Sequence, residues 1–564
     1  MSTRRRFLVT SALPYANGPI HFGHIAGAYL PADIFVRYLR LMGEDVVYIC
    51  GTDEHGVAVT ITARKEQATP RAVNDKYHKV IYDLFKHFEI SFDNFSRTSL
   101  PRHHELSQEF FLGLVKKDLI TKAAEKQYYC AHDAMFLPDR YISGTCPQCG
   151  QPNARGDECP RCGSWIDQMR FTDPRCSLCG REPEVRETEH WFLRLDALQP
   201  RLEEWFSKKT HWKTNVRTSA LGMLKEGLKP RAVTRDLDWG IPVPLPDAGG
   251  KVIYVWFEAP IGYISSTIEW AERTGKNWKD YWCNEETRLI HFIGKDNIVF
   301  HALVFPATLI GLGGYILPEN VPANEFYNYE SSKFSTSEKR YVEPERFFSR
   351  YGSDVIRYVI AATMPETQDS EFRWKDFQTR NNSELADTLG NFVNRVLTFV
   401  VKNFDAKIPD GAANLIERDS KMLAMRSIIT ERIGDEIEHF AFRRALEEFM
   451  GFARECNRYF DERAPWKSNK ENKADCAAVM YVTVHLVLTL AATMRPFMPT
   501  AAARVFAMLG GETLAANLDW AAGGSHLFPG DWALGKPEVL FAKIDDAAIA
   551  EELALLSDTD AGNV

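Results

Sequence analysis

Two histidines three positions apart, His21 and His24, have the spacing of a phosphate-binding group. Side chains at i and i+3 on the first turn of a helix face the same side, so both imidazoles can donate to one anion. The amides at a helix N-terminus add positive potential, and Gly23 between the histidines allows close backbone approach. The segment indicates a nucleotide site; the alternative is a pair of surface histidines at a helix start.

The cysteines form a second chemical pattern, because seven of the 11 lie between residues 130 and 179. Cys146 and Cys149 form one C-x2-C pair, and Cys159 and Cys162 form another. Each pair brings two thiolates onto one turn, and two such turns complete a tetrahedral zinc site. Four protein ligands leave no open position, so the spacing predicts a structural zinc ion that stabilises a segment poor in apolar periodicity.

The elements that position the histidines have an alternating pattern. Short apolar runs alternate with helical patterns from residue 6 to about 120, and further strand-like runs occur at 46–53, 252–257 and 289–294. This alternation is typical of a parallel α/β sheet, whose ligands bind at the carboxyl ends of strands. Residues 120–232 are richer in cysteine, glycine and proline, which indicates an insertion in that domain.

The chain becomes helical beyond Leu385. One face of a predicted long helix carries apolar residues at spacings of three and four, namely Met422, Met425, Ile429, Ile433, Ile437 and Phe440. Residues 479–490 predict a buried helix that Pro496 and Pro499 end. We therefore expect a helical bundle over residues 388–530. In the α/β part, Pro31 predicts a kink or a break in the first helix.

The bulk composition sets only broad limits. A length of 564 residues predicts about three to four domains, and 45% apolar with 26% charged residues is ordinary for globular proteins. A net charge of -8 argues mildly against nucleic acid as the only ligand, but an acidic protein can carry a local basic surface. No apolar run reaches about 18 residues. The basic first residues lead directly into a strand without room for a signal segment, so we expect a cytoplasmic protein.

Two distant segments together resemble a known family. H-F-G-H at 21–24 and K-F-S-T-S at 333–337 resemble two signature motifs of class I aminoacyl-tRNA synthetases. The flanking S-A-L-P-Y-A-N-G, the segment V-W-F-E-A-P-I-G-Y at 255–263 and the cysteine pairs resemble the methionine-specific members. The resemblance extends from about residue 7 to about residue 530. By itself, K-F-S-T-S would be only a polar loop.

The resemblance implies a fold and its division into domains. We expect an α/β Rossmann-type (HUP-like) catalytic domain with a zinc-knuckle connective insertion, followed by an all-α anticodon-binding helical bundle. The predicted boundaries are 1–120 and 233–325 for the two catalytic halves, 121–232 for the insertion, 326–387 for a stem-contact region with the KMSKS-like loop, 388–530 for the bundle and 531–564 for a C-terminal extension.

The resemblance also assigns a nucleotide site. It implies catalytic roles for His21, His24, Lys333 and Thr336. The residues implied to bind ATP are Asn17, His21, Gly23, His24, Gly294, Asp296, Lys333 and Thr336. Gly294 and Asp296 belong to G-K-D at the end of a predicted strand and would lie near the ribose. Mg²⁺ would accompany ATP as its counterion, without a dedicated protein cage.

At Thr336 the chain departs from the family, which usually has a second lysine there. A lysine would offset charge in the transition state, whereas a hydroxyl can only form a hydrogen bond. Lys339 and Arg340 are the nearby candidates to replace that charge. The departure concerns the contribution of the loop to the rate and not the fold.

The implied methionine site combines an apolar slot with an anion. Its residues would be Leu13, Tyr15, Asp53, Trp256, Ala259, Pro260, Tyr263 and His301. The Asp53 carboxylate would accept from the α-ammonium group, and aromatic edges suit the thioether sulfur. The alternative for Trp256 is a plain core tryptophan.

Relatives with two zinc ions suggest a second metal site. Cys176 and Cys179 form another C-x2-C pair, and Cys130 lies in the segment that corresponds to its partner. The fourth ligand would be Asp133 or His132; an aspartate is acceptable but less usual beside three thiolates. The alternative is free thiols or a partly degenerate knuckle.

The resemblance assigns three residues of the helical part to a CAU anticodon. Asn391 and Arg395 lie at i and i+4 on one predicted helix face, and Trp466 follows later in the chain. Loop bases of RNA are recognised by stacking on aromatic side chains and by hydrogen bonds to their edges. The alternative for Asn391 and Arg395 is a solvated helix face.

The function implied is ATP-dependent activation of L-methionine to methionyl-adenylate and its transfer to tRNA(Met), including the initiator tRNA. The insertion is too short for the editing domain of the isoleucine, leucine and valine members. One rival is a non-catalytic tRNA-binding synthetase paralogue, supported only by Thr336. Another is a different nucleotidyltransferase with an H-x-G-H site, which would not need the anticodon set. We expect a monomer, since the chain ends about 30 residues after the bundle.

Overall fold

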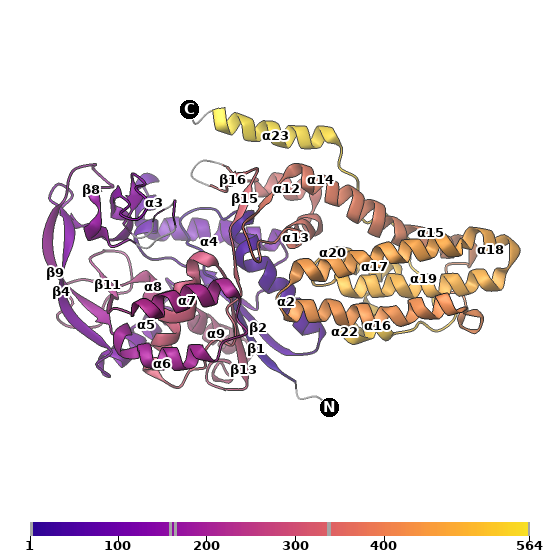
Figure 1. The fold of residues 1–564 in the computed structure, drawn as a ribbon, viewed down its shortest axis with the longest axis horizontal. Coiled ribbons are helices and arrows are strands. Elements are labelled where there is room, and N and C mark those ends of the chain that lie inside the picture. Colours follow the sequence, from indigo (N-terminus) through magenta and orange to yellow (C-terminus); the bar gives the residue numbers. More distant parts are fainter. Residues whose placement is uncertain (1–3, 157–158, 160, 163–165, 336–339, 562–564) are drawn as a thin grey trace.

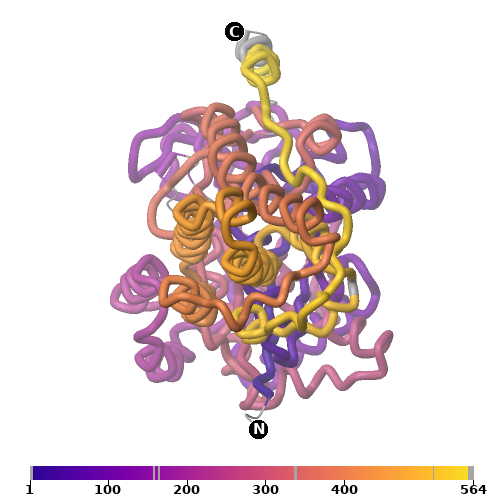
Figure 2. Tube along the Cα trace, turned by 90° about the vertical axis from the view of Figure 1, so that its right-hand side faces the viewer, coloured from indigo at the N-terminus to yellow at the C-terminus, as the bar shows by residue number. Residues whose placement is uncertain are grey.

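The computed structural model of the chain describes residues 4–156, 159, 161–162, 166–335 and 340–561. The molecule is elongated, with an α/β part at one end and a bundle of long helices at the other (Figure 1). Seen along the bundle, the C-terminal segment runs past the bundle helices to α23 (Asp546–Ala561) at the top (Figure 2). There α23 contacts α12 (Pro344–Tyr351) through ion pairs of Glu551 and Glu552 with Arg346.

A five-stranded parallel sheet forms the centre of the α/β part, with the strand order β14-β13-β1-β2-β3. The strands are β1 (Arg6–Ser11), β2 (Asp45–Thr52), β3 (Asn94–Arg97), β13 (Thr287–Gly294) and β14 (Ala323–Asn324). β1 pairs in parallel with both β13 and β2. These strands are mostly buried apolar runs, as expected for a parallel sheet with helices on both faces. The predicted parallel α/β sheet is confirmed.

Helices cover the sheet on both sides. α2 packs on β1 and β2, and α9 packs on β2 and β3. The helices of this part are α2 (Leu30–Leu41), α3 (Val57–Lys65), α4 (Pro70–His87), α5 (Pro101–Val115), α9 (Ile261–Thr274), α10 (Lys279–Trp282) and α11 (Phe305–Leu312). Pro31 lies in the first turn of α2, where its missing N–H is tolerated, and residues Ile25–Tyr29 before it wind as a π-helix. The break predicted at Pro31 is thus a change of winding within a continuous helical run.

The strand predicted at 252–257 is largely wrong. Only Val252–Ile253 (β12) is extended, and it pairs antiparallel with β11 (Thr234–Arg235) outside the main sheet. Residues Val255–Glu258 form a helical turn, α8, in which the amides of Phe257 and Glu258 donate to the carbonyl oxygen of Tyr254. A short apolar run is buried equally well as strand or helix, so periodicity could not distinguish the two.

The insertion consists of a long antiparallel ribbon and a module at its tip. The ribbon comprises β4 (Ile120–Cys130), β5 (Met135–Phe136), β9 (Glu184–Leu193) and β10 (Arg231–Ala232). The module between β4 and β9 contains β6 (Ile142–Thr145), β7 (Ala154–Arg155) and β8 (Thr172–Cys176). Helices α6 (Leu195–Ser207) and α7 (Thr214–Glu226) then lead back toward the sheet.

A small connecting region links the catalytic part to the bundle. It contains β15 (Tyr327–Tyr329), β16 (Ser332–Lys333), β17 (Ser370–Phe372), α13 (Ser353–Ala362) and α14 (Trp374–Thr379). The bundle comprises η6 (Arg380–Gly390), α15 (Asn391–Asn403), α16 (Glu417–Glu438), α17 (Phe442–Arg463), α18 (Pro465–Glu471), α19 (Lys473–Met494), α20 (Pro499–Met508), α21 (Glu512–Asn517) and α22 (Trp520–Ser525).

Helix α19 is the core of the bundle. It is long and apolar enough to cross a membrane, but 94% of its apolar window is buried among the other helices, as in a soluble core helix. The predicted apolar face of α16 is also buried at Met422, Ile433 and Ile437. Phe440 lies beyond the end of α16, and its ring packs 5.0 Å from that of Phe35 on α2. It therefore contributes to the contact between the bundle and the catalytic part.

A buried arginine joins the catalytic part, the connecting region and the bundle. Arg357 on α13 donates to the carbonyl oxygens of Phe88 at 2.8 Å, Pro496 at 2.8 Å and Phe497 at 2.9 Å. Its Nη2 also lies 2.7 Å from the Asp33 carboxylate on α2, and both side chains have no exposed surface. Phe88 follows α4, and Pro496 and Phe497 follow α19, so one guanidinium contacts all three regions.

Asp33 has a second cationic partner in Arg37, at 2.7 Å. Burial by itself would raise the pKa of the Asp33 carboxyl, but Arg37 and Arg357 outweigh burial and lower that pKa to about 2. For Arg357, burial outweighs the attraction of Asp33 and lowers the pKa of the guanidinium. Burial thus disfavours the charged form of both Asp33 and Arg357, and their mutual attraction opposes this desolvation penalty.

Replacing Arg357 should destabilise the junction. Arg357→Met retains apolar volume but removes the donors to three carbonyl oxygens and one partner of a buried carboxylate. Breaking a buried pair in this way costs about 3–5 kcal/mol, which urea or thermal unfolding would detect. The matched control is Arg458→Met, whose ion pair with Glu455 is at the surface of α17, and we expect a change within about 1 kcal/mol. If Arg357→Met and Arg458→Met lowered the free energy of unfolding by the same small amount, the proposed role of Arg357 at the junction would be contradicted.

Candidate active site and metal clusters

The two histidines lie at the carboxyl edge of the sheet, where the chain leaves β1. His21 precedes the short helix α1 (Phe22–His24), and the His24 amide donates to the His21 carbonyl oxygen at 2.9 Å. Their two Nδ1 atoms are 3.1 Å apart, so one ring donates to the other. The cleft walls desolvate both rings and lower both pKa values, His21 further because of His24, although His24 still faces the open cleft. Both are therefore neutral imidazoles near pH 7.

A cleft of about 1160 Å³ contains most of the predicted nucleotide residues. Its lining includes Asn17, His21, Gly23, His24, Gly294, Asp296 and Lys333, together with Leu13, Tyr15 and Trp256 from the predicted methionine site. Its far wall is formed by the insertion, including Arg140 and Arg155. The structure therefore brings these predicted residues together from widely separated parts of the chain. Thr336 and Lys339 lie outside the described residues.

Phe334 connects the two distant motifs. Its ring stacks on His21 with centroids 4.8 Å apart and an interplanar angle of 13°, and on Tyr329 of β15 at 5.1 Å. Ser335 and Arg340 close the loop with paired backbone hydrogen bonds of 3.0 and 2.7 Å. No role was predicted for Phe334, because a phenylalanine within a polar loop carries no signal of its partner.

Two glycines of the site are required by close contacts. A Cβ at Gly23 would lie 2.9 Å from the His21 ring and 3.0 Å from the carbonyl oxygen of Tyr327. A Cβ at Gly294 would lie 2.6 Å from the Asp296 carboxylate. Gly23 was predicted to allow close approach of the protein backbone to the nucleotide; in the structure it lies against the carbonyl oxygen of Tyr327 in the connecting region. Lys295, between Gly294 and Asp296, is held by ion pairs with Glu325 and Asp369, both at 2.8 Å.

The amino-acid end of the site lies beside the end of β2. Tyr15 and Asp53 form a parallel β-bridge, and the Asp53 amide donates to the carbonyl oxygen of Pro14 at 2.9 Å. The indole N–H of Trp256 donates to the Tyr15 hydroxyl. Leu13 packs against Gly262, where an added Cβ would lie 3.1 Å from its Cδ2 atom. The predicted residues of the first loop and of 255–263 therefore meet, as expected.

The deeper half of the predicted slot is closed in this structure. Asp53, Tyr263 and His301 are 3%, 1% and 4% exposed and are not part of the cleft wall. His301 donates through Nδ1 to the carbonyl oxygen of Asn297 at 3.0 Å, so its Nε2 accepts from the Tyr263 hydroxyl at 2.8 Å. Tyr15 and Trp256, which form a hydrogen bond with each other, do line the cleft, whereas Ala259 is partly and Pro260 fully buried.

The four cysteines of the first two pairs form a cluster whose sulfur atoms all lie within 4.8 Å of one another. Cys146 and Cys162 are 3.9 Å apart at sulfur, and Cys149 and Cys159 are 3.7 Å apart. A tetrahedron with Zn–S bonds near 2.3 Å has edges of about 3.8 Å. The arrangement therefore fits a zinc ion bound by four thiolates.

A second cluster gathers Cys130, Asp133, Cys176 and Cys179 within the same limit. The sulfur atoms of Cys130 and Cys179 are 3.5 Å apart, and Asp133 Oδ2 lies 3.0 Å from Cys130 and 3.2 Å from Cys176. His132 is exposed and contacts Asp133 Oδ1 at 3.3 Å from outside the cluster. Of the two predicted alternatives for the fourth ligand, the geometry favours Asp133.

The predicted anticodon residues lie at the far end of the bundle, near α15 and α18 (Figure 1). The Arg395 guanidinium lies 5.7 Å from the Trp466 ring centre and 4.8 Å from that of Phe460, and it pairs with Asp461 at 2.7 Å. Trp466 is 41% exposed. Asn391 is exposed one turn before Arg395 on α15, so the three residues share one accessible surface.

Comparisons with known proteins match both parts of the chain. The model for class I tRNA synthetases of the M type matches residues 7–397, and the model for the anticodon binding domain of methionyl tRNA ligase matches residues 408–559. The methionine–tRNA ligase of Christiangramia forsetii is 45% identical over 99% of this chain and 82% of its own length. That of Pyrococcus furiosus is 46% identical over 96% of this chain and 76% of its own.

The solved structures agree with these matches. The crystal structure of Mycobacterium tuberculosis methionyl-tRNA synthetase bound by methionyl-adenylate has a TM-score of 0.80 to this fold at 26% identity. The alignment covers 95% of this chain and 100% of that chain. The likeness therefore extends over the catalytic part, the insertion and the bundle together.

A parallel sheet whose carboxyl edge carries the H-x-G-H histidines, matched by the class I model, makes the chain a class I aminoacyl-tRNA synthetase. Within that class it belongs to the methionine–tRNA ligase family. The fold class, the enzyme class and the function predicted from the sequence are confirmed. These matches give no support to the non-catalytic paralogue.

Proposed function

We propose that the cleft activates L-methionine with ATP and that the chain then loads it onto tRNA(Met), including the initiator tRNA. The contact of Phe334 with His21 is the observation that supports this site most directly. Lys333 and Phe334, the first residues of K-F-S-T-S, line the same cleft as His21, His24, Tyr15 and Trp256. An α-phosphate bound there would be within reach of both motifs and of an amino acid in the adjoining slot.

In the first step, the methionine carboxylate attacks the α-phosphorus of ATP in line, giving methionyl-adenylate and releasing pyrophosphate. His21 and His24 are neutral, so neither is a fixed charge and each has one N–H to donate. One ring can donate to a phosphate oxygen directly, and the other can do so once the contact between the two Nδ1 atoms is broken. Lys333 supplies positive charge, and Mg²⁺ accompanies ATP as counterion. Catalysis is then mainly positioning and charge stabilisation by Asn17, Gly23, Gly294, Asp296 and these residues.

Methionine binding would use both halves of the slot. Asp53 accepts from the α-ammonium group, and Leu13, Tyr15, Trp256, Ala259, Pro260, Tyr263 and His301 surround the thioether side chain. Because Tyr263 donates its proton to His301, its oxygen can still accept from the ligand side. Breaking the hydrogen bond between Tyr15 and Trp256 would give the methionine side chain access to the buried residues Tyr263 and His301.

In the second step, the terminal ribose hydroxyl of tRNA attacks the acyl carbon and displaces AMP. At the other end of the molecule, Trp466 offers a stacking surface to an anticodon base, worth about 1–3 kcal/mol. Asn391 and Arg395 would bind base edges of CAU. The chain would act as a cytoplasmic monomer.

The cysteine clusters would hold structural zinc. Cys146, Cys149, Cys159 and Cys162 would bind one ion, and Cys130, Asp133, Cys176 and Cys179 a second. Closed sets of four protein ligands supply folding free energy to the module at the tip of the ribbon, and no ligand position is left for a reactant.

Methionine-dependent ATP–pyrophosphate exchange tests the proposed activity. The wild-type chain should exchange with methionine and not with isoleucine, leucine, valine or cysteine. His21→Asn should lower the rate by about 10²-fold, because one donor to the phosphate is lost. The control is His439→Asn, an exposed histidine at the end of α16, which should leave the rate unchanged. Folded, zinc-loaded protein without any exchange would exclude the synthetase function.

The affinity for methionine should depend on pH through Asp53. Burial, with Glu258 and Glu54, raises the pKa of the free Asp53 carboxyl well above its ordinary value. The ammonium group binds the ionised carboxylate, so binding releases a proton wherever Asp53 starts protonated. Below that pKa the affinity should fall by about tenfold per pH unit. Calorimetry in buffers of different ionisation enthalpy measures the proton, and Asp53→Asn should abolish its release.

Metal analysis of purified protein tests the clusters. We expect two zinc ions per chain in the wild type, one in Cys149→Ser and one in Cys176→Ser. Cys283→Ser, an exposed cysteine outside both clusters, is the matched control and should retain two. If the wild type holds one zinc ion per chain and Cys176→Ser also holds one, the second cluster does not bind zinc and its thiols are only packed together.

A further inference from the structure

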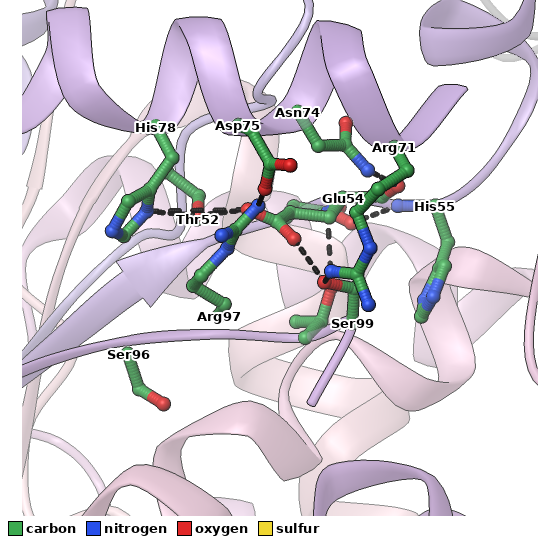
Figure 3. Close-up of polar contacts among 12 residues, drawn as sticks. Thr52, Glu54, His55, Arg71, Asn74, Asp75, His78, Ser96, Arg97 and Ser99 are labelled. Carbon is green, nitrogen blue, oxygen red and sulfur yellow. Dashed lines mark hydrogen bonds and ion pairs between the residues drawn. The ribbon is translucent and has the colours of Figure 1, made fainter. Parts of the chain in front are cut away.

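Three consecutive ionisable residues are buried where β2 ends. Asp53, Glu54 and His55 are 3%, 0% and 2% exposed. The three side chains have separate surroundings, and Figure 3 shows Glu54 at the centre of one network with His55 pointing away from it. Charged side chains are seldom fully buried without partners, so each of the three needs an explanation.

Glu54 fixes the segment to the sheet and its helices. Its carboxylate accepts from Thr52 at 2.9 Å, from Arg97 at 2.7 Å and from Ser99 (Figure 3). Its carbonyl oxygen accepts from Asn74 and from Trp239, both at 2.7 Å. The Glu54 amide also donates to the Thr98 hydroxyl at 2.9 Å, so hydrogen bonds through its side chain and its backbone hold Glu54 in place.

His55 connects the same segment to the other half of the methionine slot. Its Nδ1 donates to Glu258 Oε1 at 2.8 Å, and His103 donates through Nε2 to Glu258 Oε2 at 2.6 Å. Glu258 is fully buried and lies between Trp256 and Ala259 in the chain. Each carboxylate oxygen of Glu258 already accepts a hydrogen bond from one histidine, and the side chain has no exposed surface. Glu258 can therefore act on a ligand only through its neighbours.

Gly56 allows this segment to lie directly on α8. Its φ is 85°, a conformation that favours glycine, and a Cβ there would lie 3.1 Å from Val255 Cγ1. The docking of residues 53–56 on Val255–Glu258 thus combines a close backbone approach with one buried ion pair. This is the place where the ammonium half and the apolar half of the slot are joined.

One carboxylate of the segment has far fewer partners than the others. Arg97 forms an ion pair with Glu54, and His55 and His103 each form a hydrogen bond with Glu258. His104 lies 3.3 Å from His55, and burial with the neighbouring histidines lowers its pKa to about 4, so it is neutral. Within the described part of the chain, Asp53 has only the His55 amide as a polar contact to its carboxylate, at 3.5 Å.

We propose that Glu258, through His55, is a positioning residue that holds the Asp53 carboxylate in place for the ammonium group of methionine. The proposal rests on the proposed function, in which Asp53 binds that ammonium. Without the ion pair, His55 would lose its anchor on α8, and its amide would no longer fix Asp53 relative to Trp256. Glu258 itself touches no reactant.

A purely structural role makes a different prediction. If the contact between His55 and Glu258 only stabilised the core, its loss would lower the unfolding temperature and reduce the apparent kcat through loss of folded protein, with both KM values unchanged. A positioning role changes the KM for methionine and leaves the KM for ATP unchanged. The matched control is Glu269→Gln on α9, which alters a carboxylate bound by Ser96 and Asn94 without contact to His55.

The experiment is ATP–pyrophosphate exchange with Glu258→Gln, Asp53→Asn and the double variant. We expect Glu258→Gln to raise the KM for methionine by about tenfold or more, with the KM for ATP within about twofold. When Glu258→Gln is added to Asp53→Asn, the KM for methionine should not rise further, because both substitutions disable the same interaction, that of Asp53 with the ammonium group. The proposal would be overturned if the two substitutions raised the KM for methionine independently, so that their factors multiplied in the double variant. It would also be overturned if Glu258→Gln lowered the melting temperature and left the KM for methionine unchanged.

His55 provides a second route if Glu258→Gln does not fold. His55→Asn retains a donor close to the position of Nδ1, whereas His55→Ala removes it. The KM for methionine should rise in His55→Ala and stay near the wild-type value in His55→Asn; equal values in the two would overturn the proposal. An unchanged KM in Asp53→Asn would instead refute the ammonium assignment itself, so the two failures are distinguishable.

Discussion

Arg357 donates to carbonyl oxygens at the ends of α4 and α19 and pairs with Asp33 on α2, all without exposure to solvent. None of these elements can shift alone without leaving a buried polar group unpaired, which costs about 1–3 kcal/mol or more for each group. Apolar contacts such as that of Phe440 with Phe35 lie at the same junction. The cleft and the anticodon surface at opposite ends of the molecule therefore have a defined relative orientation.

The carboxyl edge of the sheet explains why residues so far apart in sequence form one site. Parallel strands β1, β2 and β13 all end there, and the following turns carry His21, Asp53 and Gly294. The connecting region then places Phe334 on His21 from outside the sheet. Each contribution comes from a short loop on a buried scaffold, so modest changes in the loops can alter chemistry without altering the fold.

The electrostatics of the two halves of the site differ. At the nucleotide end both histidines are neutral, so in the proposed complex they would act on phosphate oxygens by hydrogen bonding, and Lys333 and the counterion of ATP would offset the charge. At the amino-acid end three carboxylates are buried close together; Arg97 pairs with Glu54, and His55 and His103 form hydrogen bonds with Glu258. In the proposed complex the ammonium group of the substrate would give Asp53 the partner that it lacks in the protein.

The sequence by itself determined the chemistry: the H-x-G-H pair, the C-x2-C spacings and the alternating apolar runs predicted a nucleotide site, a zinc module and a parallel sheet. These features are local, because helix-turn geometry and metal coordination depend on residues a few positions apart. Tertiary structure alone decided that Val255–Glu258 is helical, that Asp133 and not His132 joins the second cluster, that Phe334 stacks on His21 and that Glu258 contacts His55. His55 lies 203 residues before Glu258, and His21 more than 300 residues before Phe334, and no pattern within one segment encodes such contacts.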